Sequence, residues 1–143
     1  MALSENDISF LEVNHSAAMI TIGADGLPKV ARVAVALVDG KLWSSATQDR
    51  TRTKRLRRDS RCTLYVYDPA FSWLALETTV KILDGPDAPE LTVQLFRRML
   101  GRPTGPLNWF GQEVEEDDFR RMMVEDRRLI FEFDVHRTYG APG

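Results

Sequence analysis

A cluster of basic residues from 50 to 61 is the part of the sequence whose residue types and spacing could do chemistry. Seven of its twelve residues are lysine or arginine, whereas the whole chain of 143 residues holds only 19. Leu56 is the one apolar anchor in the cluster, so we expect a short, solvent-facing turn of helix. Hydroxyl groups at Thr47 and Thr53 could cap backbone N–H groups or bond a phosphate. The cluster therefore predicts an anion-binding site, with a solvated charged face as the alternative.

Composition limits the class of protein that carries this cluster. The chain is 43% hydrophobic and 28% charged, which predicts one globular domain over residues 1–143. The net charge of −2 argues against a nucleic-acid partner, because nucleic-acid-binding domains usually carry a large basic excess. No apolar run approaches the roughly 18 residues of a membrane span, and the N-terminus lacks a signal-peptide pattern. We therefore expect a cytoplasmic protein that binds a small anion and has no membrane partner.

The other reactive residue types form no recognisable catalytic or metal-binding motif. Cys62 is the single cysteine, which excludes an internal disulfide, and we expect it to be a small core hydrophobe. His15 and His136 lie far apart in the sequence and lack an ordered acid partner. The acidic run from 113 to 118 lies at a predicted helix N-terminus, where the helix dipole favours negative charge. We expect no metal site.

The elements that must position the basic cluster are short strands joined mainly by tight turns. Asp-Gly pairs at 25–26 and 39–40 are typical of hairpins. Apolar periodicity predicts helices near the N-terminus, over 91–100 and over 114–124. This pattern predicts a mainly β (α+β) fold, a six-stranded antiparallel barrel with peripheral helices. The expected strands are 17–22, 30–38, 41–46, 62–67, 72–83 and 127–135.

Two segments outside the cluster are candidate ligand contacts. One side of the strand expected over 30–38 carries Arg32 between small or β-branched side chains, so a flat ligand or a second subunit could approach its backbone closely. The Gly/Pro-rich segment 101–111 is expected to be a loop, and it carries Trp109 and Phe110. These residues extend the candidate site beyond the arginines.

Four motifs in this order of elements resemble a known family. They are Asp25-Gly-Leu-Pro28, the run from Arg50 to Asp59, Asp126-Arg-Arg-Leu129 and Tyr139-Gly-Ala-Pro142. From about Phe10 to Tyr139 the chain resembles the split-barrel flavin-binding family of pyridoxamine 5′-phosphate oxidase and the deazaflavin (coenzyme F420)-dependent oxidoreductases. It is most similar to the short actinobacterial branch. The resemblance implies a split β-barrel homodimer with two cofactor sites at the subunit interface.

The resemblance also implies which residues contact the cofactor. Arg50 and Arg52 fall on the family's basic motif and would hold the phosphate or the anionic tail. Trp73 matches a position from which the second subunit helps to enclose the cofactor, and Trp109 with Phe110 would form a mobile lid over the ring. The implied cofactor-binding residues are Arg32, Thr47, Arg50, Arg52, Thr53, Lys54 and Trp73. By contrast, we expect Arg57, Arg58 and Arg61 to be surface residues or partners of Asp59.

Arg32 is a departure from the family, whose members commonly have a small polar pair at Ala31-Arg32. It could contact the ring's carbonyl edge, the anionic tail or the substrate.

The implied activity is reduction of an electron-poor double bond in a small organic substrate by reduced coenzyme F420. A flavin or deazaflavin carries the hydride itself, so we expect no catalytic side chain. A broad basic surface suits the long anionic tail of the deazaflavin better than the single phosphate of FMN. Two alternatives remain, which are an FMN-dependent oxidoreductase of the same fold and a non-enzymatic carrier of the coenzyme.

Overall fold

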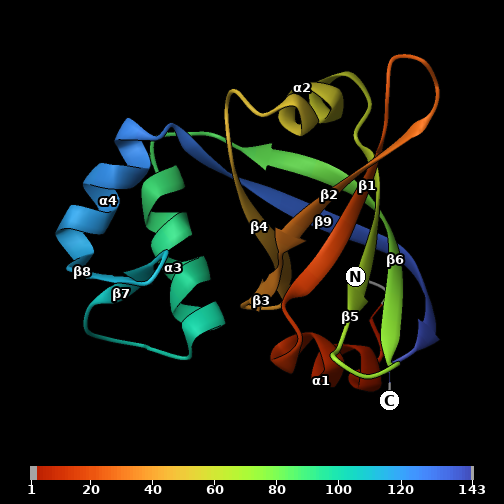
Figure 1. The fold of residues 1–143 in the computed structure, drawn as a ribbon, viewed down its shortest axis with the longest axis horizontal. Helices are drawn as coiled ribbons and strands as arrows, with labels where there is room; N and C mark the ends of the chain where they lie inside the picture. Colours follow the sequence, from red (N-terminus) through yellow and green to blue (C-terminus); the bar gives the residue numbers. More distant parts are fainter. Residues whose placement is uncertain (1–2, 143) are drawn as a thin grey trace.

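The structure, a computed structural model, describes residues 3–142 as a curled antiparallel sheet with helices at its ends and along one side (Figure 1). Seven strands form the sheet in the order β2-β1-β5-β6-β9-β4-β3, and β7 pairs with β8 in a separate hairpin. The strands are β1 (Ser16–Ile22), β2 (Pro28–Ala34), β3 (Ala36–Val38), β4 (Lys41–Thr47), β5 (Arg61–Tyr67), β6 (Trp73–Leu83), β7 (Leu107–Trp109), β8 (Gln112–Val114) and β9 (Arg128–Ala141). The helices are α1 (Glu5–Val13), α2 (Thr51–Arg58), α3 (Ala88–Leu100) and α4 (Glu116–Glu125).

The predicted number of six strands is wrong, because the segment 30–38, expected to be one strand, is divided between two strands of the seven-stranded sheet. β2 pairs with β1 at one edge of the sheet, whereas β3 pairs with β4 at the other. Between them, the Val35 amide donates to the carbonyl oxygen of His15 at 2.8 Å. Ser44 Oγ donates to the Ala34 carbonyl oxygen at 2.7 Å. Consecutive residues thus join the two edges, so the sheet must curl until the edges meet. We call this junction the seam.

The inner face of the curled sheet holds the main core. Leu64, Leu76 and Phe131 are completely buried there, as strand alternation predicts for one face of each strand. Leu11 of α1 and Leu56 of α2 belong to the same cluster, and these two helices lie at opposite ends of the sheet (Figure 1). Within residues 3–142, no helix is both long enough and apolar enough to cross a bilayer. The predicted fold class, mainly β with helices packed outside, is confirmed.

A second layer, made of α3, β7, β8 and α4, lies outside the β3–β4 side of the sheet (Figure 1). Leu95 of α3 packs against Trp43 and Ile130 on the outer face of the sheet. Phe119 and Leu107 form a further cluster inside the layer itself. The segment 101–111, predicted to be a loop, contains β7, and α4 begins at Glu116 because 112–114 pair with β7. This layer supplies a wall opposite the sheet.

Candidate functional site

A cavity of about 440 Å³ lies between the outer face of the sheet and the second layer, beside the seam. We call it the seam cavity. Its sheet side is formed by β2, β4 and β9, α2 contributes a basic residue, and α3 with the β7–β8 turn forms the remaining wall. The lining is divided into a cationic and hydroxyl-bearing part and an aromatic part.

The cationic part brings together three arginines from distant parts of the sequence. They are Arg32 of β2, Arg52 of α2 and Arg128 of β9, and no carboxylate among residues 3–142 lines the cavity with them. Arg52 Nε and Ser45 Oγ are buried in the described structure without a hydrogen-bond partner. Buried polar atoms without partners are rare and costly, and guanidinium groups favour anions. The lining is therefore complementary to an anion.

Electrostatics at Arg52 support the same conclusion. Burial is the main cause that lowers the pKa of the Arg52 guanidinium, and the nearby charges of Arg50 and Arg128 lower it further. The charged form is thus destabilised by lost hydration and by repulsion between like charges. An anion in the cavity would counter both effects.

The local sequence explains why Arg52 reaches the cavity while its neighbours do not. Leu56 is buried and anchors α2 on the core, and Thr53 is completely buried beside it. Arg52 lies four residues before Leu56, so both share one side of the helix. Arg50 and Lys54 are exposed and line no part of the seam cavity. Helical spacing therefore selects one basic residue of the cluster for the site.

The aromatic part of the lining is a packed wall. The ring centroid of Trp109 lies 5.5 Å from that of Phe96 and 5.9 Å from that of Phe119. The guanidinium carbon of Arg128 lies 4.9 Å from the Trp109 centroid, a distance suited to a cation–π contact. Arg128 Nε donates to Asp126 at 2.7 Å, which fixes the guanidinium in place. Trp109 is thus held from both sides.

Phe110, at the rim of the cavity, is much freer. It begins the two-residue turn between β7 and β8, and its side chain is 85% exposed. Its φ of +49° is in the left-handed region, and Gly111 follows with φ +86°. Its ring packs edge-on against Trp109, with centroids 4.7 Å apart.

Four predicted site residues therefore meet at one place, namely Arg32, Arg52, Trp109 and Phe110. The hydroxyl of Thr53 donates to the Thr47 carbonyl oxygen at 2.8 Å, so it stabilises the start of α2. Neither of these threonines lines the cavity.

Trp73 lies in a different place, in an aromatic cluster that we define as Tyr65, Tyr67, Phe71, Trp73 and Tyr139. Its ring stacks on Tyr65 with centroids 5.6 Å apart and meets Tyr139 edge-on at 6.2 Å. Phe71 is 96% exposed. Trp73 therefore does not reach the seam cavity of its own chain.

Sequence reasoning missed Ser45, Arg128 and Phe96 as lining residues. Ser45 lies two residues before Thr47 in β4, so the same strand face leads to the basic cluster. The alternation of side chains along the strand could therefore have identified Ser45 from the position of Thr47. Arg128 pairs with Thr47 across two neighbouring strands, a register that no local pattern reveals.

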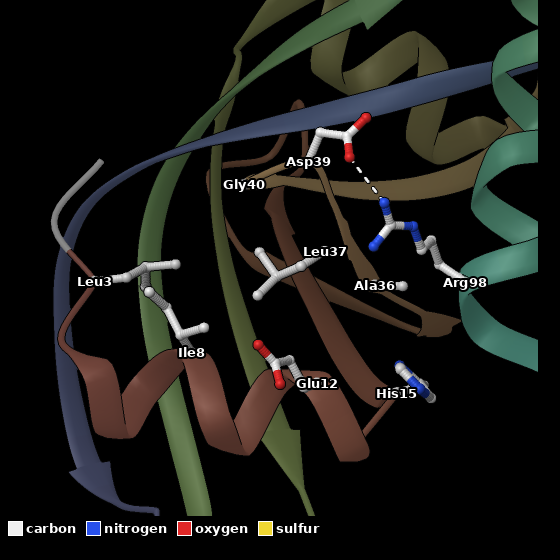
Figure 2. Close-up of a pocket in the computed structure, with 9 residues that line it drawn as sticks. All are labelled: Leu3, Ile8, Glu12, His15, Ala36, Leu37, Asp39, Gly40 and Arg98. Atoms are coloured by element: carbon white, nitrogen blue, oxygen red, sulfur yellow. Dashed lines mark hydrogen bonds and ion pairs between the residues drawn. The ribbon is translucent and has the colours of Figure 1, made fainter. Parts of the chain in front are cut away.

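A second cavity, of about 570 Å³, lies between α1 and β3 but fits an anion less well (Figure 2). Glu12 and Asp39 contribute carboxylates to its lining. Its guanidinium, on Arg98, already bonds Asp39 at 2.7 Å. Ile8 and Leu37 add apolar surface. The seam cavity is therefore the better candidate site.

The residues with acid–base or nucleophilic potential have structural partners elsewhere. Cys62 is in the core, where burial raises the pKa of its thiol to about 12. His15 Nδ1 lies 2.9 Å from the Val35 carbonyl oxygen, and His136 Nε2 lies 2.8 Å from Thr79 Oγ1. None of these three side chains lines the seam cavity.

Comparison with known proteins gives one family and a consistent set of folds. Residues 4–140 match the family described as pyridoxamine 5′-phosphate oxidase. Among solved structures, an F420 reductase is 20% identical with a TM-score of 0.70, and the match covers 96% of this chain and 98% of that one. A conserved hypothetical protein from Mycobacterium tuberculosis is 23% identical with a TM-score of 0.72, covering 99% and 86%. A putative pyridoxamine 5′-phosphate oxidase from Lactobacillus delbrueckii is 14% identical with a TM-score of 0.64, covering 96% and 93%. These structures share the fold.

Proposed function

The chain belongs to the pyridoxamine 5′-phosphate oxidase family, and on that premise we propose that it is an F420H2-dependent oxidoreductase. Its reaction would be the reduction of an electron-poor double bond in a small organic substrate. The observation that carries the proposal is the pair of buried, unpaired atoms, Arg52 Nε and Ser45 Oγ, in a cavity lined by three arginines.

The residues present fit the phosphorylated end of such a cofactor. A guanidinium can bond two phosphate oxygens at once, and a serine hydroxyl can donate a further hydrogen bond to one of them. Arg52 and Ser45 would therefore hold the phosphate. The bound cofactor supplies the hydride, while the chain supplies orientation, charge and protection from water. Trp109, packed in the aromatic wall, would exclude water from one side of the cavity.

The choice of the deazaflavin over FMN is supported by charge outside the cavity. Arg50, just before α2, and Lys54 on α2 are exposed near Arg52, and within residues 3–142 neither makes an ion pair. A long anionic tail could interact with these two positive charges, whereas the single phosphate group of FMN would interact only with residues inside the cavity. FMN in the same site is the alternative cofactor.

The proposed active form is a homodimer in which the aromatic cluster of one copy covers the seam cavity of the other. Support comes from the exposure of this cluster, with Phe71 at 96% and Tyr139 at 46%. Large exposed aromatic side chains grouped together are typical of interaction surfaces. Light scattering after size exclusion should give the mass of a dimer. Trp73→Ser should weaken both the dimer and cofactor binding, and a monomeric wild type would contradict this assembly.

Calorimetric titration with reduced or oxidised F420 and with FMN, side by side, tests the proposed cofactor. The proposal predicts tighter binding of F420 than of FMN, followed by oxidation of the reduced coenzyme with at least one enone or quinone. Tighter binding of FMN than of F420 would make FMN the assigned cofactor. Binding of F420 without oxidation by any acceptor would favour a carrier, and no binding of either compound would reject the proposal.

A further inference from the structure

We propose that the seam cavity has a second anion position at Arg32, next to an aromatic rim formed by Phe110. The molecule it accepts would be planar and carry a carboxylate group. This inference rests on the proposed function, which assigns Arg52 and Ser45 to the cofactor phosphate. It goes further because it names the chemical class of the second ligand.

The first step is the balance of charge within the cavity. Asp126 neutralises Arg128 through the 2.7 Å hydrogen bond at Nε. A phosphodiester carries one negative charge, which balances Arg52. Arg32 remains, and no residue among 3–142 forms an ion pair or hydrogen bond with its side chain. Arg32 is exposed to solvent as well as to the cavity, so its guanidinium would still be open to an anionic ligand when the cofactor phosphate is bound.

The second step is the position of Arg32 on the sheet. It lies on β2, opposite Ala18, and its neighbours on the same face are Val30 and Ala34. Their small or β-branched side chains leave the guanidinium accessible from the cavity side. A carboxylate can take two hydrogen bonds from one guanidinium, which gives both affinity and orientation. Arg32 is therefore well suited to a ligand carboxylate.

The third step concerns the conformation of Phe110. Two consecutive positive φ angles, at Phe110 and Gly111, define a turn that favours Asn-Gly and disfavours a bulky first residue. Phe110 is also 85% exposed to water. Neither property helps the fold, and strained residues gather at binding sites. A ring at the rim of a cavity can stack on a flat ligand, and β2 forms the other side.

The two contacts can be tested separately with 2-naphthoate and 2-naphthamide, which match in shape and differ in charge. Calorimetry would use the full chain with F420 at saturation. Wild type should bind the acid at least about 10-fold more tightly than the amide, as expected for a charge-assisted pair. Arg32→Gln should bring this ratio close to one, while Arg121→Gln, an exposed control outside both cavities, should leave it unchanged. An unchanged ratio in Arg32→Gln, or no binding to wild type, would overturn the inference.

Phe110→Asn provides a second test, because it should raise stability while it weakens ligand binding. It creates the favoured Asn-Gly turn, so the melting temperature should rise while both probes bind about 10-fold more weakly. Phe110→Tyr should retain binding. Leu27→Asn removes another exposed apolar side chain, 59% exposed and without positive φ, and should change neither binding nor turn strain. If Phe110→Asn bound both probes with wild-type affinity, the proposed stacking role of Phe110 would be wrong.

The design separates this inference from the proposed function. If F420 fails to bind but naphthoate still binds in an Arg32-dependent way, the cofactor assignment fails and the second position stands. If F420 binds and naphthoate depends on Arg52 instead, the cavity has one anion position and the inference fails.

Discussion

Replacement of Arg52 by methionine should stabilise the ligand-free protein and weaken cofactor binding at the same time. Methionine keeps most of the side-chain length, but it removes the buried Nε donor that has no partner and the charge beside Arg50 and Arg128. An unsatisfied buried donor costs about 1–3 kcal/mol, and because Arg52 is only half-buried we take the lower end, about 1 kcal/mol. In a domain of this size, that gain raises the melting temperature by roughly 3 °C.

The effect of Arg52→Met on binding has the opposite sign. Hydrogen bonds to charged groups contribute about 1.5–3 kcal/mol, so the Kd for F420 or FMN should rise about 10- to 150-fold. Urea unfolding without ligand and calorimetric titration measure the two effects independently. Arg61→Met is the control, because Arg61 is exposed and pairs with Asp59 at the surface, and it should leave the urea midpoint essentially unchanged. A destabilised Arg52→Met, or one with wild-type affinity, would refute the assignment of Arg52 to an anion.

Three further predictions concern the scaffold. The Cys62 thiol, whose pKa burial raises to about 12, should react with a maleimide near neutral pH only after unfolding, and rapid labelling of the native chain would contradict this. Gly140→Ala should lower the free energy of unfolding by more than about 1 kcal/mol in urea, because at φ +141° its Cβ would lie 2.6 Å from the Trp73 carbonyl oxygen; an unchanged midpoint would show that the strands adjust. The hydrogen bond from Arg97 is the main cause that lowers the pKa of Glu116 below 4.5, so its stabilisation is present above that pH and is lost as pH falls through the folded pKa. Glu116→Gln should thus be less stable than wild type at neutral pH and equally stable in strong acid; a gap that persists in acid would disprove the ionic cause.

The sequence predicted most of the sheet because its signals are local. The turn at Asp39 and Gly40 has positive φ at both residues, as the Asp-Gly pair indicated. The division of 30–38 into two strands was not predictable in this way, because no glycine, proline or other turn residue separates the two halves. It depends on the contact between Val35 and the carbonyl of His15, which are twenty residues apart. Strand partners are set by tertiary contacts that periodicity does not contain.

Charge density located the basic segment of the site but did not identify which residues line it. Within the cluster, Arg57, Arg58 and Arg61 are all exposed and Arg61 bonds Asp59, so the expectation that they are surface residues or partners of Asp59 is confirmed. Arg58 donates to the Ile22 carbonyl oxygen. Of the seven basic residues, only Arg52 lines the seam cavity. Its partner in the lining, Arg128, comes from β9 and ends the mixed run of charges 125–128, which has no basic excess to mark it.

The location of the cavity follows from the way the sheet closes. The seam is held by a few contacts, such as Ser44 Oγ to the Ala34 carbonyl, rather than by a continuous ladder. The second layer must cover the outer face of β4 and β9 to bury Trp43 and Ile130, and it stops at the seam. At this boundary, Ser45 Oγ and Arg52 Nε are buried without a hydrogen-bond partner in the described structure. A ligand can satisfy them, and binding should therefore stabilise the closed sheet as well as occupy the site.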